Sequence, residues 1–381
     1  MVVNIVARRR IRGPAPQRNV VSDWNIYSGS RPMLIREQVP LAPLTTLGVG
    51  GPARYFLEAT SEQEVIEGVR FARSKNLPLF ILGGGSNLVI ADKGFLGVVL
   101  KIALRGIEQV ESIAGGVQFR VAAGENWDAF VARTVEANCA GLECLSGIPG
   151  SVGGTPVQNV GAYGQEVANT IQQVCAVDLE SLKAITFSNA DCKFAYRSSL
   201  FNTSDRGRYI ILQAAFSLHR GAPPTIRYAD LQKFFAGKTS QPTLAEVRAA
   251  VREIRHSKAM LIVPGDDDAR SAGSFFKNPV IPLAQFEQLA SSVRQRGLQL
   301  PGYPAGDGSR KLPAAWLVEH AGFGKGYGSG AVGISRRHTL AIVNRGGATA
   351  TDIIALKDAI QHRVLEAFGI ALEPEPVLVG F

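Results

Sequence analysis

Three segments in the first half of the chain combine several glycines with small polar residues. They are TTLGVGGPARYF at residues 45–56, GGGSNL at residues 83–88 and GIPGSVGGTPVQNVGAYG at residues 147–164. Glycine tolerates positive φ, and consecutive backbone N–H groups in such turns form a concave surface that binds phosphate oxygens. One glycine cluster is usually only a tight turn, but three of them favour a ligand that carries phosphate.

The two common phosphate-binding motifs do not match these segments. GGGSNL lacks the Lys-Ser or Lys-Thr of a Walker loop, and no G-x-G-x-x-G stands between a strand and a helix with an acid downstream. A large dinucleotide such as FAD needs several separated loops around one elongated molecule, so FAD is one candidate. GGGSN contains no histidine or cysteine for a covalent flavin bond, and we therefore expect non-covalent FAD.

Longer motifs carry a more specific signal. The sequence contains, in this order, GGGSN, GLE followed by GIPGSVGG, QNVGAYG, YRSSLF, GSFFKNP and LEPE. Over residues 40–380 these motifs resemble the UDP-N-acetylenolpyruvoylglucosamine reductase (MurB) family of peptidoglycan synthesis. YRSSLF together with GSFFKNP is far more specific than any single glycine loop.

The resemblance implies an α+β fold, with a two-lobed FAD-binding domain of the PCMH, or vanillyl-alcohol-oxidase, type and a smaller α/β substrate domain. It also implies reduction of UDP-N-acetylglucosamine enolpyruvate to UDP-N-acetylmuramate, with NADPH as the reductant. Hydride addition to an enol ether leaves charge on the carbon next to the carboxylate. That carbon needs a proton donor and cationic or hydrogen-bonding neighbours.

Three residues match catalytic positions of the family. Ser274 matches the proton donor, Arg197 the arginine that faces the substrate carboxylate, and Glu375 the C-terminal carboxyl that assists the enol intermediate. A planar guanidinium can bind two carboxylate oxygens and oppose the developing charge. Glu373 lies two residues from Glu375, and alternation in an extended segment does not separate them, whereas motif alignment favours Glu375.

Binding positions follow from the same motifs. The candidates for FAD are the N–H groups of two glycine loops: Gly83, Gly84, Gly85, Ser86, Asn87, Gly150, Ser151, Gly153 and Gly154. The positions that resemble substrate contacts are Tyr163, Tyr228, Lys258, Asn278 and Lys311. Tyr228 resembles the tyrosine that closes over the nucleotide in the loop-bearing type of the family. His320 stands where the family commonly has glutamine, which alters one expected substrate contact.

Composition indicates a soluble globular protein. Hydrophobic residues make up 46% of the chain, and no apolar stretch approaches the roughly 18 residues of a membrane span. The formal charge is +9, but residues 1–32 hold six arginines against one aspartate. We expect this segment to be a disordered extension, or to lie upstream of a true start near Met33. Its arginine-rich, acid-poor composition also resembles that of an organellar transit peptide. Basic and aromatic residues do not interleave, so we expect no nucleic-acid partner.

The four cysteines form no C-x-x-C pair and no metal-ligand spacing with the five histidines. We therefore expect reduced thiols, no metal and a cytoplasmic location. We also expect a monomer whose partner is the small UDP-sugar.

Periodicity and capping signals predict helices over residues 61–75, 127–135, 283–296 and 352–368, and one that follows Thr243 and ends near His256. The run 314–321 is expected to belong to the smaller α/β unit. Strands are expected over 77–82 and 340–343 and within 97–124 and 171–217. The predicted domains are an extension (1–38), an FAD-binding domain (39–220, completed by 368–381), a connecting loop and helix (221–257) and a substrate domain (258–367).

Two alternatives stay open from the sequence. Another FAD oxidoreductase of the same fold would share the first half of the chain but has no need of GSFFKNP and YRSSLF. A non-catalytic protein that binds a UDP-sugar or a polyanion would purify without flavin.

Overall fold

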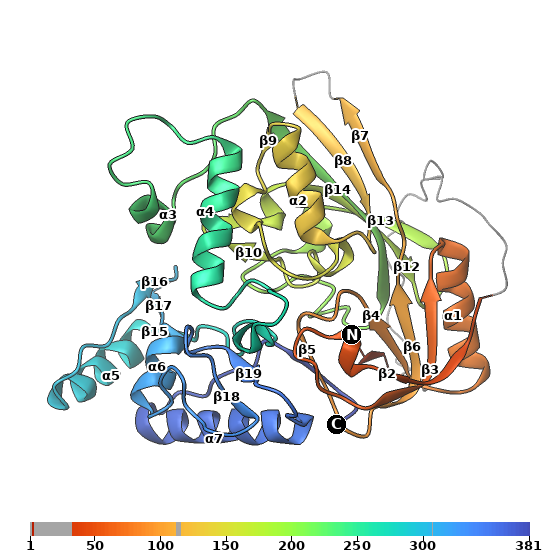
Figure 1. The fold of residues 1–381 in the computed structure, drawn as a ribbon. Helices are drawn as coiled ribbons and strands as arrows, with labels where there is room; N and C mark the ends of the chain where they lie inside the picture. The colour runs from red at the N-terminus through yellow and green to blue at the C-terminus, as the bar shows by residue number, and fades with distance from the viewer. Residues whose placement is uncertain (1, 4–32, 112–115, 307) are drawn as a thin grey trace. The chain divides into compact units, whose positions relative to one another are not determined.

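The computed structural model describes residues 2–3, 33–111, 116–306 and 308–381 (Figure 1). These residues form two compact units. The first unit comprises the residues up to Pro40 together with Pro52–Gly85 and Gly94–His256. The second comprises Leu41–Gly51, Ser86–Lys93 and Ser257–Phe381. No helix in the described ranges has the length and hydrophobicity of a membrane span.

The first lobe of the first unit is a sheet with strand order β1-β4-β6-β3-β2. Its strands are β1 (Val2–Val3), β2 (Arg36–Pro40), β3 (Pro52–Ala59), β4 (Leu79–Leu82) and β6 (Phe95–Ile102). β3 and β4 run parallel to β6. Helix α1 (Glu62–Ser74) joins β3 to β4, and Ser61 caps it by accepting a hydrogen bond from the Glu64 N–H at 3.2 Å. Its apolar face packs on β3 and β6, as the predicted amphipathic helix requires.

The second lobe is an antiparallel sheet with strand order β13-β12-β14-β8-β7, and β9 also pairs with β14. Its strands are β7 (Ile107–Glu111), β8 (Gly116–Ala122), β9 (Cys139–Ala140), β12 (Ile171–Asp178), β13 (Ala184–Ser188) and β14 (Tyr209–Arg220). Helix α2 (Trp127–Glu136) packs through Phe130, whose ring lies 5.1 Å from that of Phe216. The indole N–H of Trp127 donates to the Leu145 carbonyl at 3.1 Å, which fixes the segment that precedes the third glycine loop.

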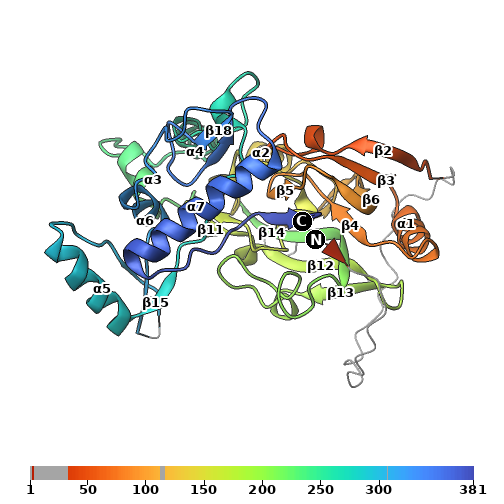
Figure 2. The same cartoon turned by 90° about the horizontal axis from the view of Figure 1, so that it is seen from below.

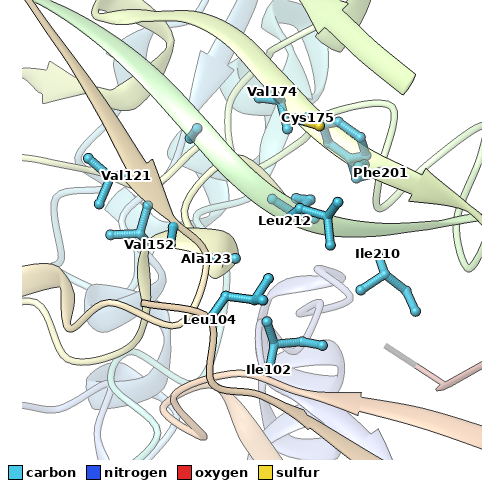
Figure 3. Close-up of a cluster of buried hydrophobic side chains, with 14 of the residues drawn as sticks. Ile102, Leu104, Val121, Ala123, Val152, Val174, Cys175, Phe201, Ile210 and Leu212 are labelled. Atoms are coloured by element: carbon cyan, nitrogen blue, oxygen red, sulfur yellow. The ribbon is translucent and has the colours of Figure 1, made fainter. Parts of the chain in front are cut away.

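Both lobes of this unit contribute to one hydrophobic core. Figure 3 shows side chains from the two sheets and from the third glycine segment pointing toward one another. They include Ile102, Leu104, Val121, Val152, Val174 and Leu212. All four cysteines are buried free thiols, as expected, and burial raises the pKa of Cys175 to about 12. Burial also raises the pKa of Cys144, so Cys144 and Cys175 are protonated packing groups at neutral pH.

Two helices and a hairpin complete the first unit. The hairpin is formed by β10 (Gly161–Ala162) and β11 (Gln165–Glu166). Helix α3 (Ala229–Phe234) and helix α4 (Leu244–Ser257) pack on each other through a small apolar cluster that includes Leu231 and Val251. Leu244, Val247 and Val251 lie on the buried face of α4, in agreement with the predicted periodicity.

The described residues of the second unit form three small sheets and three α-helices. In the first sheet β5 (Leu88–Ile90) pairs in parallel with β20 (Val377–Val379). In the other sheets β17 (Ser309–Lys311) pairs with β15 (Val280–Pro282) and β16 (Tyr303–Pro304), and β18 (Val332–Ile334) pairs with β19 (Ile342–Asn344). The helices are α5 (Leu283–Gln295), α6 (Ala314–His320) and α7 (Ala350–Phe368), with α7 beside α6 in Figure 2. Gly369 ends α7 with φ 66°, as predicted.

The borders of the units differ from the predicted domains. Residues 36–38, expected in the extension, belong to β2, whereas residues 1 and 4–32 lie outside the described residues. Segment 368–381 was expected to complete the FAD-binding domain, but its strand β20 groups with the second unit. The reason is long-range pairing, because β20 adds to β5 and both then pack with residues 257–381. Local patterns contain no information on that pairing.

Candidate functional site

Two of the predicted glycine loops lie against each other in the first unit. A Cβ atom at Gly84 would come within 2.5 Å of the Gly150 Cα atom, and one at Gly83 within 2.9 Å of the Ser151 Oγ atom. A Cβ at Gly153 would meet that of Ala123 at 2.6 Å. At Gly154, by contrast, a Cβ would have no protein atom within 4 Å. Gly84 therefore allows a close approach of two backbone segments, whereas the nearest atoms at Gly83 and Gly153 belong to side chains. Gly154 faces open space.

The GGGS backbone has unused hydrogen-bond donors. Within the described ranges, the N–H groups of residues 83–86 donate no hydrogen bond to another part of the protein. Gly85 is buried and has φ 68°, the left-handed conformation that glycine favours. A buried N–H without a protein acceptor needs water or a ligand. This stretch therefore has the donors and the lack of side chains that an anionic group needs.

Asp128 fixes the beginning of the third glycine loop. Its carboxylate accepts hydrogen bonds from the Gly147 N–H and from Arg248, both at 2.6 Å, and from Arg252. Burial acts to raise the pKa of Asp128, but these hydrogen bonds and the two guanidinium charges outweigh it, so the pKa lies below its ordinary value. Since Arg248 and Arg252 lie on α4, this carboxylate links α4, α2 and the loop.

Tyr163 and Tyr228 are in direct contact. Their ring centroids lie 5.4 Å apart at an interplanar angle of 85°. Tyr163 has φ 50° and hydrogen bonds with the deeply buried Arg255, whose pKa is lowered by desolvation. Tyr228 is 45% exposed and precedes α3. The two predicted substrate-side tyrosines therefore pack against each other. Tyr163 is held by Arg255, and Tyr228 lies at the surface.

Arg197 lies in a tight turn of the first unit. Residues Ala195 and Ser198 pair across this turn, and Arg197 occupies the left-handed region with φ 53°. Its carbonyl accepts from the Asn202 side chain at 3.2 Å, and its guanidinium lies over the Tyr196 ring at 5.5 Å from the centroid. A non-glycine residue in this conformation is strained, and such residues occur often at functional sites.

Ser274 and Glu375 lie in the second unit on paired segments. Phe275, next to Ser274, donates its N–H to the Leu340 carbonyl at 2.8 Å and accepts from the Glu375 N–H at 2.9 Å. Asn87 joins the same group, since its side chain donates to the Glu375 carbonyl at 3.2 Å and its carbonyl accepts from the Val377 N–H at 3.0 Å. The structure therefore brings together three of the predicted residues, Asn87, Ser274 and Glu375.

The two candidate carboxylates differ in environment. The side chain of Glu373 is 69% exposed and forms an ion pair with Lys277. Glu375 is half-buried and lies in the segment paired with Phe275. The surroundings thus favour Glu375 over Glu373, a distinction that alternation did not provide.

The remaining predicted substrate positions lie in the second unit. Lys258 is half-buried just after α4, and Lys311 lies in β17 opposite Val280 and Tyr303. The Asn278 side-chain oxygen accepts the Ala314 N–H at 2.9 Å, so this residue caps α6. That structural use was not predicted. His320 stacks on Trp316 with ring centroids 4.0 Å apart, and its Nδ1 lies 2.8 Å from the Trp316 carbonyl.

Sequence reasoning missed His338, Asp128 and Arg255. His338 Nε2 lies 3.4 Å from the Ser274 Oγ atom, although 64 residues separate them. No local spacing signals such a contact. Asp128 and Arg255 lie on predicted helices, where a charged residue ordinarily faces solvent.

Two family models match separate parts of the chain. A model of an FAD binding domain matches residues 53–181, and a model of the UDP-N-acetylenolpyruvoylglucosamine reductase C-terminal domain matches residues 265–379. The predicted order of domains, an FAD-binding domain followed by the C-terminal domain of these reductases, is confirmed. The chain is therefore an FAD-containing oxidoreductase.

Similar proteins cover nearly the whole chain. The UDP-N-acetylenolpyruvoylglucosamine reductase of Thermobifida fusca is 47% identical over 90% of this chain and 97% of its own length. That of Streptomyces avermitilis is 45% identical over 96% of this chain and 98% of its own length. The crystal structure of the reductase from Thermus caldophilus has a TM-score of 0.60 at 25% identity and covers 91% of this chain and 99% of its own. The chain belongs to the UDP-N-acetylenolpyruvoylglucosamine reductase family.

Proposed function

We propose that the protein reduces UDP-N-acetylglucosamine enolpyruvate to UDP-N-acetylmuramate in peptidoglycan precursor synthesis, with bound FAD and with NADPH as reductant. One observation carries the proposal. Ser274, which matches the family's proton donor, lies beside Phe275, and Phe275 is hydrogen bonded to both Leu340 and Glu375. A hydroxyl and a carboxyl on two hydrogen-bonded segments are the groups that protonation of an enol intermediate requires.

The glycine loops fit a non-covalent FAD. Residues 83–85 leave N–H groups without protein acceptors, and side chains are absent where Gly84 approaches Gly150. Such a cradle suits diphosphate oxygens. We assign Gly83, Gly84, Gly85, Ser86, Asn87, Gly150, Ser151, Gly153 and Gly154 to FAD. Asp128 holds the beginning of the third glycine loop through the Gly147 N–H.

Bound FAD supplies hydride transfer between NADPH and the unsaturated sugar ether. The residues of this chain stabilise the negative charge that develops on the substrate and supply the proton. Ser274 Oγ–H donates its proton to the substrate carbon next to the carboxylate. Arg197 binds that carboxylate through its planar guanidinium, which opposes the charge that develops on it. Glu375, which lies on the segment hydrogen bonded to Phe275, assists this protonation.

We assign five residues to the substrate. Tyr163 and Tyr228 offer apolar faces with hydroxyl ends, which suit a sugar nucleotide, and exposure of Tyr228 leaves it accessible. Lys258 and Lys311 supply ammonium groups for the diphosphate. Asn278 uses its side-chain oxygen for α6, so its NH₂ group is the part we assign to a sugar oxygen.

The proposal is tested by turnover of the purified, FAD-loaded protein. Oxidation of NADPH should require UDP-N-acetylglucosamine enolpyruvate, and mass spectrometry should find a product that has gained two hydrogens. NADPH oxidation that is the same with and without this sugar nucleotide, and yields no such product, would reject the proposed substrate. Protein that purifies without flavin and does not bind added FAD would reject the flavoenzyme itself.

A further inference from the structure

His338 is the side chain that the structure brings next to the Ser274 hydroxyl. Its Nε2 atom lies 3.4 Å from the Ser274 Oγ atom, and both residues are half-buried. With the proton on Nε2, the imidazole donates to Oγ. This contact lies within the second unit and joins the glycine-rich segment before Phe275 to the turn before β19.

The turn that carries His338 is organised around one carboxylate. The Ser335 hydroxyl donates to Asp268 at 2.7 Å and accepts from the N–H groups of Arg337 and His338 at 3.0 and 3.1 Å. The Arg336 N–H also donates to Asp268, at 3.1 Å. Burial acts to raise the pKa of Asp268, but these hydrogen bonds and the charge of Arg337 lower it, so the carboxylate stays ionised.

The segment that carries Ser274 is also held by backbone and side-chain hydrogen bonds. Ser271 pairs with Val343 of β19, the Gly273 N–H donates to the Ser271 hydroxyl at 3.2 Å, and the Phe275 N–H donates to the Leu340 carbonyl at 2.8 Å. Two hydrogen-bonded segments therefore hold the serine and the histidine opposite each other. The histidine is thus fixed in place by backbone and carboxylate contacts, unlike a mobile surface side chain.

A serine hydroxyl needs such a neighbour if it is to donate a proton. An unperturbed alcohol is a poor acid at neutral pH, and the alkoxide that remains must be stabilised and reprotonated before the next turnover. Imidazole changes protonation state near neutral pH and exchanges protons readily with water.

We propose that His338 is a positioning residue for Ser274 that also returns its proton. This inference rests on the proposed function. As the Ser274 O–H bond breaks, a C–H bond forms on the substrate. The Ser274 oxygen then takes the proton from His338 Nε2, so that an imidazolium becomes neutral imidazole, and the imidazole regains a proton from solvent. No oxidant or reductant beyond NADPH is needed.

The experiment compares His338→Gln and His338→Ala with the wild-type holoenzyme. His362→Ala is the matched control, because His362 lies on the exposed side of α7. Anaerobic rapid mixing measures flavin reduction by NADPH and, separately, flavin reoxidation by UDP-N-acetylglucosamine enolpyruvate. Reoxidation is repeated in D₂O and, for His338→Ala, with added imidazole.

Flavin reduction should stay within about twofold of wild type, and reoxidation should slow roughly 10- to 100-fold in His338→Ala, within the range of general acid–base effects. The reoxidation rate should fall less in His338→Gln, because the glutamine amide can still donate a hydrogen bond to the Ser274 Oγ atom. The solvent isotope effect on reoxidation should rise in both variants, and imidazole should restore part of the rate to His338→Ala. A residue that only supports the fold would show neither effect.

Unchanged reoxidation in both variants would overturn the inference, and so would equal loss of both half-reactions or loss of FAD in both variants. Wild-type flavin that NADPH reduces but the enolpyruvyl sugar does not reoxidise would instead reject the proposed function itself. The two failures are therefore distinguishable.

Discussion

Gly84 packs so closely on Gly150 that a Cβ atom at position 84 would lie 2.5 Å from the Gly150 Cα atom. This approach brings two glycine loops together that are more than sixty residues apart in the sequence. The FAD site proposed here depends on it. Substitution at Gly84 therefore tests whether the paired loops hold the cofactor.

Gly84→Ala should force the two loops apart, because the added methyl group meets backbone and not a flexible side chain. We expect a loss of about 1–3 kcal/mol in the free energy of unfolding, as for overpacked sites, and FAD affinity at least about tenfold weaker. Urea unfolding of the apoprotein and flavin fluorescence titration measure the two effects.

Gly154→Ala tests FAD binding separately from the stability of the fold. A Cβ atom there meets no protein atom within 4 Å, so the stability of the apoprotein should change by less than about 0.5 kcal/mol. Affinity for FAD should fall if the cofactor approaches this residue. Gly324→Ala is the control, since its Cβ also meets nothing within 4 Å and we assign Gly324 no role in binding. If Gly154→Ala and Gly324→Ala bind FAD equally well, Gly154 is not part of the cofactor site.

Ser274→Ala should leave flavin reduction by NADPH unchanged and slow reoxidation by the enolpyruvyl sugar by about 10²- to 10⁴-fold. The reason is that only the second half-reaction needs the proton. Stopped-flow absorbance of the flavin measures each step. Ser291→Ala, at an exposed position of α5, should match wild type in both. Parallel loss of both steps in Ser274→Ala would instead indicate a damaged binding site.

Glu375→Gln and Glu373→Gln form a matched pair. Glu373 is exposed and paired with Lys277, whereas Glu375 lies in the segment bonded to Phe275. We expect Glu375→Gln to slow turnover by about tenfold or more and Glu373→Gln to change it less than twofold. The reverse order would transfer the proposed role to Glu373. Steady-state NADPH oxidation with the sugar nucleotide decides between them.

Asp128→Asn should destabilise the protein in a pH-dependent manner. The folded state holds the pKa of Asp128 below its ordinary value, so its contribution is complete above the unfolded pKa of about 3.9 and is lost as the pH falls through the folded pKa. At pH 7 we expect about 1–3 kcal/mol lower free energy of unfolding for the variant. The difference from wild type should narrow below about pH 4. A difference that stays constant down to acid unfolding would show that the carboxylate charge is not responsible.

Local sequence patterns predicted most individual elements of the fold. The amphipathic spacing and caps of α1, α4 and α7 are local signals, and the structure has these helices within one to two residues of the predicted ends. The borders of the units were not predictable in the same way. They depend on the pairing of β5 with β20, which joins residues about 290 positions apart.

In the candidate site, too, local motifs predicted some residues, whereas contacts between distant parts of the sequence could not be predicted. Motifs predicted functional roles for Asn87, Ser274 and Glu375, and the hydrogen-bonded segments that carry these residues meet in the second unit. His338 was missed because its only link to Ser274 is spatial. Asp128 and Arg255 were missed because buried charges look like ordinary helix surface residues in a sequence. The glycine loops were predicted as anion sites from their composition, but only the structure shows that Gly84 meets Gly150.

The central claim is most directly tested by anaerobic mixing of the NADPH-reduced, FAD-loaded protein with UDP-N-acetylglucosamine enolpyruvate. We predict that the flavin reoxidises in a single turnover and that UDP-N-acetylmuramate forms in an amount equal to the flavin. Flavin that stays reduced in the presence of the sugar nucleotide, and reoxidises only when oxygen is admitted, would contradict the account.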